Sequence, residues 1–275
     1  MAKFSKTFFI YEAVLFLITQ FLGLYLGWRL FQIEEVKELV AKQSYSLWQF
    51  LIAFAVGTVV VLFVIKYAKS RIIFSGFFYI LIFLGCVAFF DVFALGYLGL
   101  GLALLVVILR RFMPSVLTHN LAIILAISGI SSYIGLSFLP LQIIIMLVIL
   151  SIYDFIAVFK TKHMVLMFKK MMENGANLSI IVPNKLIGFL AGMDKAKPGQ
   201  DFIFLGTGDL AFPIIFAVSV LRNSLLSSIL VIAGALLGVM AINIYFYFKK
   251  ERTAFPALPP ITIGCIIGYL VSLFF

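Results

Sequence analysis

Two aspartates lie in stretches of the chain that are otherwise apolar enough to enter a membrane. Asp154 sits in the run SIYDFIAVF, and Asp209 follows two glycines in FLGTGDLAFP. An ionisable side chain at membrane depth is costly, and it usually marks a functional site. Two carboxylates in a low-dielectric site share a proton, so one serves as general base on a water and the other as general acid. This chemistry would hydrolyse an amide bond, and which aspartate starts as base stays open because the titration belongs to the pair.

The spacing of charged residues predicts that both aspartates lie at a similar depth on neighbouring antiparallel helices. Asp154 precedes Lys160 by six residues, or about 9 Å of helix. Asp209 follows Asp201 by eight residues, or about 12 Å if that stretch is helical. A shared depth is what a carboxylate pair requires.

The glycines fall into two groups. Gly206 and Gly208 remove side chains beside Asp209, so that another backbone can approach it closely. Other glycines are interpreted as small-residue contacts between packed helices. These are Gly23/Gly27, Gly234/Gly238, Gly264/Gly268 and the run from Gly96 to Gly101.

The composition predicts an integral membrane protein built of spanning helices. Of the 275 residues, 64% are hydrophobic and only 12% are charged, against roughly 45–50% and about 25% in soluble domains. A β-barrel is disfavoured, because the apolar runs are continuous over about 20 residues and do not alternate. The net charge of +10 indicates basic cytoplasmic loops better than a nucleic-acid surface.

The apolar runs predict an all-α membrane fold with nine transmembrane helices in a single polytopic domain, residues 1–275. Residues 1–159 would hold six spans and the first aspartate, residues 160–201 a cytoplasmic loop, and residues 202–275 the last three spans. The predicted spans are Thr7–Gly27, Leu47–Ile65, Ile72–Phe90, Val92–Leu109, Thr118–Ser137, Pro140–Phe159, Phe202–Leu221, Leu225–Phe248 and Phe255–Phe275.

The distribution of basic residues predicts the orientation. With the N-terminus inside, 17 of the 21 lysines and arginines fall on the cytoplasmic side, as the positive-inside rule expects. Nine spans then place the C-terminus outside. On this topology the sequon that begins at Asn177 is cytoplasmic and carries no glycan.

The loop from residue 160 to residue 201 has three features of its own. Its first part, residues 163–174, mixes apolar residues with lysines and is interpreted as a short helix on the membrane surface. Ser179–Pro183 and Asp201–Leu205 are β-prone runs and predict short strands. A helical substrate must unwind before it is cut, and we hypothesise that these strands pair with its freed backbone.

Other polar residues in the apolar runs are interpreted as structural. Glu12 is expected to extend to the cytoplasmic surface, Asp91 to lie at the interface and Asn243 to bond a neighbouring helix. His119 and His163 are isolated and interpreted as interfacial, and Cys86 and Cys265 show no metal-type spacing. No metal or other cofactor is expected.

Three short motifs carry a resemblance to a known family. They are Tyr153–Asp154, Gly206–Thr207–Gly208–Asp209 and Pro256–Ala257–Leu258–Pro259. In this order, each on its expected span, they resemble the presenilin and signal-peptide-peptidase family of GxGD intramembrane aspartyl proteases. The resemblance covers the whole nine-span layout, and Thr207 stands where leucine is usual in presenilins.

The resemblance implies the activity and the site. Asp154 and Asp209 would be the catalytic pair, and Tyr153, Gly206, Thr207, Gly208 and Pro256–Pro259 would shape the active site or bind substrate. The partners would be transmembrane-helix substrates and the lipid bilayer, with no obligatory accessory subunit and no nucleic acid.

The short loop is typical of a prokaryotic, archaeal-type homologue in the plasma membrane, and a homo-oligomer stays open. Two other functions also stay open from the residues alone: a proton-coupled transporter or channel, and a prepilin-type peptidase.

Overall fold

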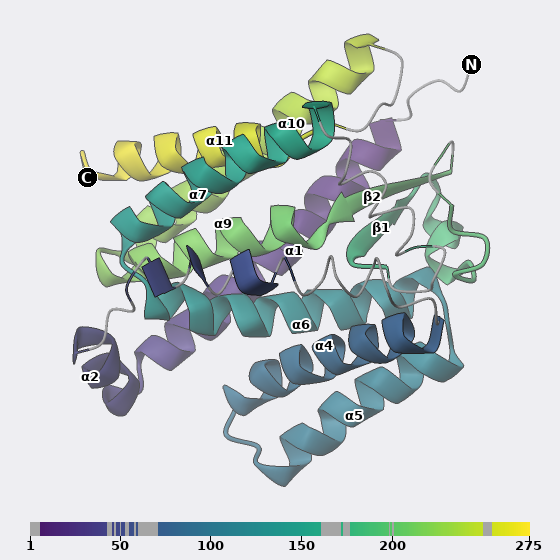
Figure 1. Cartoon of the computed structure of the whole chain (residues 1–275), viewed down its shortest axis with the longest axis horizontal. Helices are drawn as coiled ribbons and strands as arrows, with labels where there is room; N and C mark the ends of the chain where they lie inside the picture. The colour runs from purple at the N-terminus through teal and green to yellow at the C-terminus, as the bar shows by residue number, and fades with distance from the viewer. Residues whose placement is uncertain are drawn as a thin grey trace.

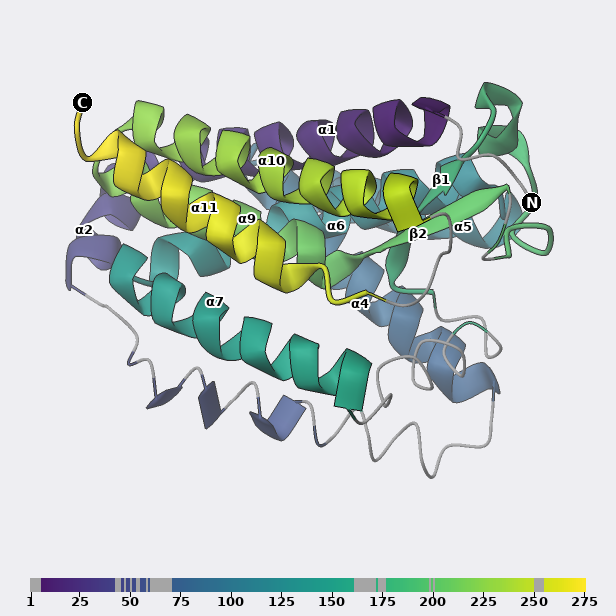
Figure 2. The ribbon, with the colours of Figure 1, turned by 90° about the horizontal axis from the view of Figure 1, so that it is seen from above.

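The computed structural model describes residues 6–42, 46, 48–49, 51–52, 55–57, 59, 71–160, 172, 177–197, 199, 201–249 and 255–275. Its helices run along one long axis, and a two-stranded sheet lies at the end opposite the C-terminus (Figures 1 and 2). The main elements are α1 (Lys6–Phe31), α2 (Glu34–Lys42), α4 (Arg71–Asp91), α5 (Tyr97–Phe112), α6 (Val116–Ser137), α7 (Pro140–Phe155), β1 (Ser179–Pro183), β2 (Phe202–Gly206), α9 (Thr207–Ser219), α10 (Leu225–Lys249) and α11 (Leu258–Ser272).

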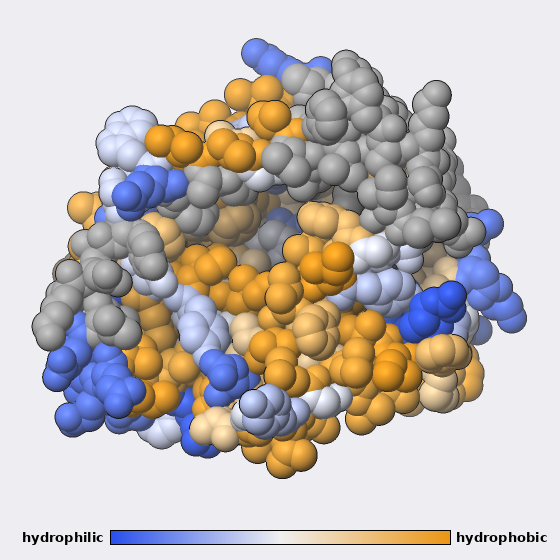
Figure 3. All heavy atoms as spheres, turned by 60° about the horizontal axis from the view of Figure 1, so that its bottom comes forward, coloured by the Kyte–Doolittle hydropathy of each residue, from blue (hydrophilic) through white to orange (hydrophobic). Residues whose placement is uncertain are grey.

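Five helices in the described ranges are long and apolar enough to cross a membrane. They are Thr7–Phe31, Phe74–Asp91, Val116–Ser137, Pro140–Lys160 and Leu225–Lys249. Apolar side chains cover the middle of the face shown in Figure 3, and hydrophilic ones gather toward its margins. The chain is therefore a multi-pass membrane protein, as its composition predicts.

The layout of nine spans is not confirmed. Helices α5, α9 and α11 have 16, 13 and 15 residues, fewer than the roughly 20 that a straight crossing needs. Most of the predicted second span, Leu47–Ile65, lies outside the described residues, as does the predicted surface helix at residues 163–174. The count of nine stays a prediction.

The predicted seventh span is wrong at its start, because Phe202–Gly206 is strand β2 and the helix begins only at Thr207. The two predicted strands are confirmed, with β1 at its predicted bounds and β2 shifted by one residue. They pair antiparallel, with Ser179 opposite Gly206 and Pro183 opposite Phe202. Backbone pairing thus replaces helix over the residues that lead to Asp209.

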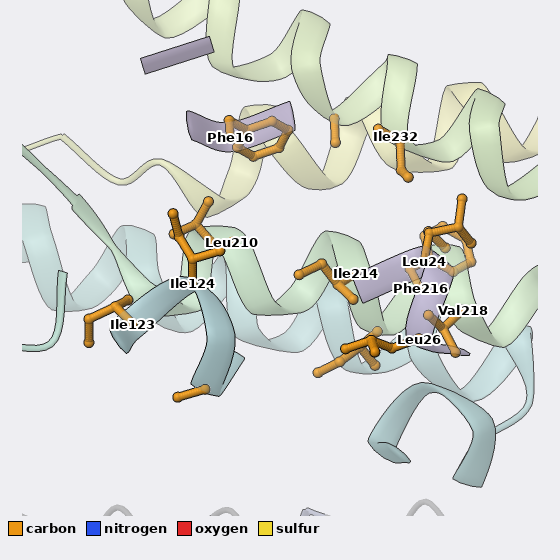
Figure 4. Close-up of a cluster of buried hydrophobic side chains, with 14 of the residues drawn as sticks. Phe16, Leu24, Leu26, Ile123, Ile124, Leu210, Ile214, Phe216, Val218 and Ile232 are labelled. Atoms are coloured by element: carbon orange, nitrogen blue, oxygen red, sulfur yellow. The ribbon is translucent and has the colours of Figure 1, made fainter. Parts of the chain in front are cut away.

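Helix α9 lies at the centre of the bundle. Its side chains are apolar on every face, which is the pattern of a helix surrounded by protein. Ile214, Phe216 and Val218 are fully buried, and they belong to one apolar cluster with Leu24 and Leu26 of α1 (Figure 4). The enclosed part of the helix, Pro213–Ser219, gives the first turn, with Asp209, a fixed position.

The three spaced glycine pairs are confirmed as packing contacts. A Cβ at Gly234 would collide with the backbone oxygen of Gly264, and one at Gly268 would collide with that of Leu230. Helices α10 and α11 therefore meet backbone to backbone. Gly23 and Gly27 make room in α1 for Ile214 and Val218 of α9.

The packing interpretation fails for part of the Gly96–Gly101 run. Gly96 has φ of 51°, and no atom lies within 4 Å of the place that a Cβ would take, so it serves the turn before α5. Gly101 also faces open space, and only Gly99 packs closely, with 3.3 Å from its Cβ position to the Phe90 Cβ.

Candidate active site

Asp154 occupies the last turn of α7 and is 7% exposed. Its Oδ2 accepts a hydrogen bond of 3.2 Å from the backbone N–H of Leu258, at the start of α11. Immediately after Phe155 the helix widens into a π-helical turn, Ile156–Lys160. Such turns are rare and are often found at functional sites.

A second polar contact fixes α7 against α11 one turn away. The Ser151 hydroxyl donates to the Thr262 hydroxyl over 2.8 Å, and both side chains are buried. Hydrogen bonds between membrane helices set the relative position of their faces. Asp154 is thus held to α11 from two neighbouring turns.

Asp209 lies in the first turn of α9, directly after β2, and is partly buried. Its carboxylate accepts a hydrogen bond from the backbone N–H of Gly206 and lies within electrostatic reach of Asp154 and Glu12. The positive end of the α9 dipole also favours a carboxylate there. The structure therefore brings Asp154 and Asp209, which are far apart in sequence, into one site.

The two glycines of the GTGD motif differ in how much space surrounds the position that a Cβ would take. A Cβ at Gly206 would lie 3.0 Å from the Asp209 Oδ2, so any side chain there would press on the carboxylate. A Cβ at Gly208 would make only an ordinary contact of 3.5 Å with Phe212. The Thr207 N–H donates to the Leu178 carbonyl over 3.3 Å and continues the sheet into the helix.

The remaining predicted site residues differ in burial and in the side of the helix on which they lie. Tyr153 is 45% exposed and lies on the outer side of α7, away from the buried Asp154. In the Pro256–Pro259 motif, Pro256 and Leu258 are buried and the other two residues are partly buried. The motif reaches the site through its backbone, by way of the Leu258 N–H.

Two interpretations of polar residues are wrong. Glu12 is only 7% exposed, and its charge acts on Asp209 instead of reaching the membrane surface. His119 is fully buried, whereas an interfacial position was expected; His163 lies outside the described residues. Asp91 is exposed and accepts a hydrogen bond of 2.8 Å from the Tyr133 hydroxyl, and its place at the membrane interface stays a prediction.

Side chains of α6 pair with the edge of β1 that faces away from β2. Asn120 donates from Nδ2 to the Ile181 carbonyl over 2.7 Å and accepts the Ile181 N–H at Oδ1 over 2.8 Å. This is the pattern that a neighbouring strand would make. The side chain of Asn120 therefore completes the sheet without a third strand.

His119 extends this pairing by one more bond. The Arg110 Nε–H donates to Nδ1 of His119 over 3.1 Å, and Nε2 of His119 lies 2.9 Å from the Ser179 carbonyl. A guanidinium N–H always donates, so Nδ1 is the acceptor and the neutral ring carries its proton on Nε2. The ring thus bonds the carbonyl of the residue paired with Gly206.

Removal of the Asn120 side chain is expected to destabilise the protein. Asn120→Ala leaves the buried N–H and carbonyl of Ile181 without partners, which should cost roughly 2–4 kcal/mol of unfolding free energy. Thermal unfolding of the purified protein measures the loss. Asn223→Ala is the control, because that exposed side chain makes a single long contact of 3.3 Å to Tyr269; equal unfolding curves for both variants would contradict the edge pairing.

The comparisons with known proteins agree on one family. A family model described as "Signal-peptide peptidase, presenilin aspartyl protease" matches residues 13–275. Two solved structures of a presenilin family intramembrane aspartate protease, in C222 and P2 crystals, align with TM-scores of 0.63. Their identities are 21% and 23%, over 95% of this chain and 95% and 96% of theirs. No curated protein sequence matches the chain.

Proposed function

Because the chain belongs to the signal-peptide-peptidase and presenilin family of aspartyl proteases, we propose that Asp154 and Asp209 are its catalytic pair. The protein is an intramembrane aspartic endopeptidase that acts on transmembrane segments of membrane proteins, and the family favours this activity over transport. The observation that carries the assignment is that Asp154 of α7 and Asp209 of α9 lie within electrostatic reach of each other inside the bundle.

The proposed reaction divides the work between the two carboxylates. The ionised member takes a proton from a water as it attacks the peptide carbonyl. The protonated member donates to the carbonyl oxygen and then passes a proton to the leaving amine. The Leu258 N–H, on Oδ2 of Asp154, orients one carboxyl group, and the Gly206 N–H orients the other.

The Pro256–Pro259 motif is proposed to hold substrate beside the pair. It enters α11 at the level of Asp154, and its prolines at the helix start leave backbone groups free without breaking a formed helix. Tyr153 faces outward on α7, where it is placed to meet a substrate that arrives from the lipid.

The purified protein tests the activity directly. In liposomes it should cut a single-span helical peptide within the apolar segment, near one end, and mass spectrometry locates the cut. A tetrahedral peptide isostere of the cut site should block the reaction. Failure to cut any single-span peptide of varied sequence would count against the proposal.

The finer topology is part of the same proposal. Nine spans follow from the apolar runs, and an N-terminus in the cytoplasm with a C-terminus outside follows from the basic residues of the loops. The protein would work in the plasma membrane as a single chain without accessory subunits, whether or not it forms a homo-oligomer.

The outer edge of β2 is proposed to pair with the unwound substrate. The bonds from Thr207 N–H to Leu178 and from Asn184 N–H to Asp201 fix the alternation of the ladder. Because of that alternation, the N–H and C=O groups of Phe204 and Gly206 point away from β1. The Gly206 N–H donates to the Asp209 carboxylate. A strand added along this edge would be led to the carboxylate.

Proline substitutions on the two faces of the ladder separate pairing with substrate from pairing with β1. Phe204→Pro removes an N–H from the outer edge and should lower cleavage about 10-fold, the effect of one backbone hydrogen bond. Ile203→Pro removes an N–H directed at β1 and should lower Tm. Cleavage assays and melting curves report both, and unchanged cleavage by Phe204→Pro would exclude the pairing.

A further inference from the structure

A pair of buried polar side chains stands next to the proposed catalytic site without a role in it so far. The Ser179 hydroxyl donates to Oδ1 of Asn177 over 2.5 Å. Asn177 is 5% exposed and Ser179 is fully buried. Among the described residues, Nδ2 of Asn177 has no hydrogen-bond acceptor.

The ladder places this pair on the same face of the sheet as the Asp209 carboxylate. Ser179 is opposite Gly206, and the neighbouring bond from Thr207 to Leu178 makes this a non-hydrogen-bonded pair. Cβ positions in such a pair are about 4.5–5.5 Å apart on one face. Since the Cβ position of Gly206 is 3.0 Å from the Asp209 Oδ2, Ser179 and the Asn177 bonded to it flank the carboxylate.

A buried hydrogen-bond donor in this position lowers the stability of the protein unless an acceptor binds it. A buried amide N–H without an acceptor costs about 1–3 kcal/mol, and each such group in a native protein calls for an explanation. The Ser179 hydroxyl bonds the amide oxygen of Asn177, and Nδ2 is left as the donor with no partner among the described residues. The chemistry that would satisfy Nδ2 is a carbonyl oxygen.

We propose that Asn177, held by Ser179, binds a backbone carbonyl of the substrate beside Asp209 and thereby helps to set the rate and position of cleavage. This rests on the proposed function, because an unwound peptide strand is the ligand. A helix that unwinds in the membrane frees carbonyls that hydrocarbon cannot solvate. Nδ2 would accommodate one of them next to the bond that is cut.

The first test compares variants of the full-length protein on a single-span helical peptide. Asn177→Leu keeps the volume but removes the donor, and kcat/KM should fall about 10- to 100-fold. Nδ2 has no acceptor among the described residues, so losing it should not lower Tm, but the buried Ser179 hydroxyl also loses its acceptor Oδ1. Tm is therefore read in Asn177→Leu combined with Ser179→Ala, which should keep the wild-type value and show the same fall in kcat/KM. Ser179→Ala should give a smaller fall, since it only loosens the amide.

The matched control is Asn184→Leu, at the other end of β1 and opposite Asp201, which should cleave at the wild-type rate. Wild-type kcat/KM in Asn177→Leu would overturn the proposal. So would a fall in kcat/KM that tracks a loss of Tm in the combined Asn177→Leu and Ser179→Ala variant, since that result assigns Asn177 a structural role.

The second test probes the carbonyl in the substrate. Thioamides are placed one at a time at residues flanking the cut, because sulfur is a weak hydrogen-bond acceptor. At one position the wild type should lose activity while Asn177→Leu loses no more, which is the signature of a direct contact. Equal relative losses at every position would overturn the contact, whereas a wild type that cuts no peptide would instead refute the proposed function.

Discussion

Asp154→Asn and Asp209→Asn should each reduce cleavage of a single-span peptide by about 10⁴-fold or more, to the limit of detection. Each change removes one of two groups that act as a unit, and loss of one member of such a unit costs nearly as much as loss of all. An amide of the same shape neither takes nor gives the required proton. Peptide cleavage in liposomes, followed by mass spectrometry, measures the loss.

Asp91→Asn is the matched control, since this aspartate is exposed and bonded to Tyr133 at the end of α4. It should cleave at the wild-type rate. The two dyad variants should also keep the wild-type Tm or exceed it, because each removes a buried acid. Residual activity within about 10-fold of wild type in either variant would contradict the assignment of the pair.

Gly206→Ala should lower kcat about 100-fold while the protein stays folded. The backbone at this position has φ of −61° and ψ of 144°, which alanine adopts readily. The added methyl would stand 3.0 Å from the Asp209 Oδ2 and displace the carboxylate. A displacement of about 1 Å in an active site can cost about 100-fold in rate.

The control for this change is Gly101→Ala in α5, where no atom lies within 4 Å of the new methyl. Its cleavage rate should match wild type, and its Tm should stay equal or rise. Full activity in Gly206→Ala would show that Asp209 does not need the space beside it, and would weaken its place in the reaction.

The proposed catalytic pair could be predicted because its signal is local. Asp154 and Asp209 stand out in apolar runs, and the spacing to Lys160 and Asp201 predicts a common depth. The two strands were predictable for a similar reason, since β-prone residues bounded by Gly, Pro and Asn specify them over five residues each.

The burial of single polar residues was not predictable, because it depends on partners far along the chain. His119 and Asn120 bond β1 residues about 60 positions away. Glu12 acts electrostatically on Asp209, although almost 200 positions separate them in the sequence. An apolar run also does not reveal whether its first residues pair as a strand, so the sequence predicts both a strand (Asp201–Leu205) and a span (Phe202–Leu221) over Phe202–Leu205.

The side chains of His119 and Asn120 bond the edge of β1 that faces away from β2, so the proposed pairing with substrate is confined to the β2 edge. If substrate pairs with the outer edge of β2 as proposed, its backbone is bound next to the acidic pair, and capture in an unproductive orientation is disfavoured. The bonds from His119 and Asn120 also hinder edge-to-edge strand pairing between copies of the protein, which is a hazard of exposed strand edges.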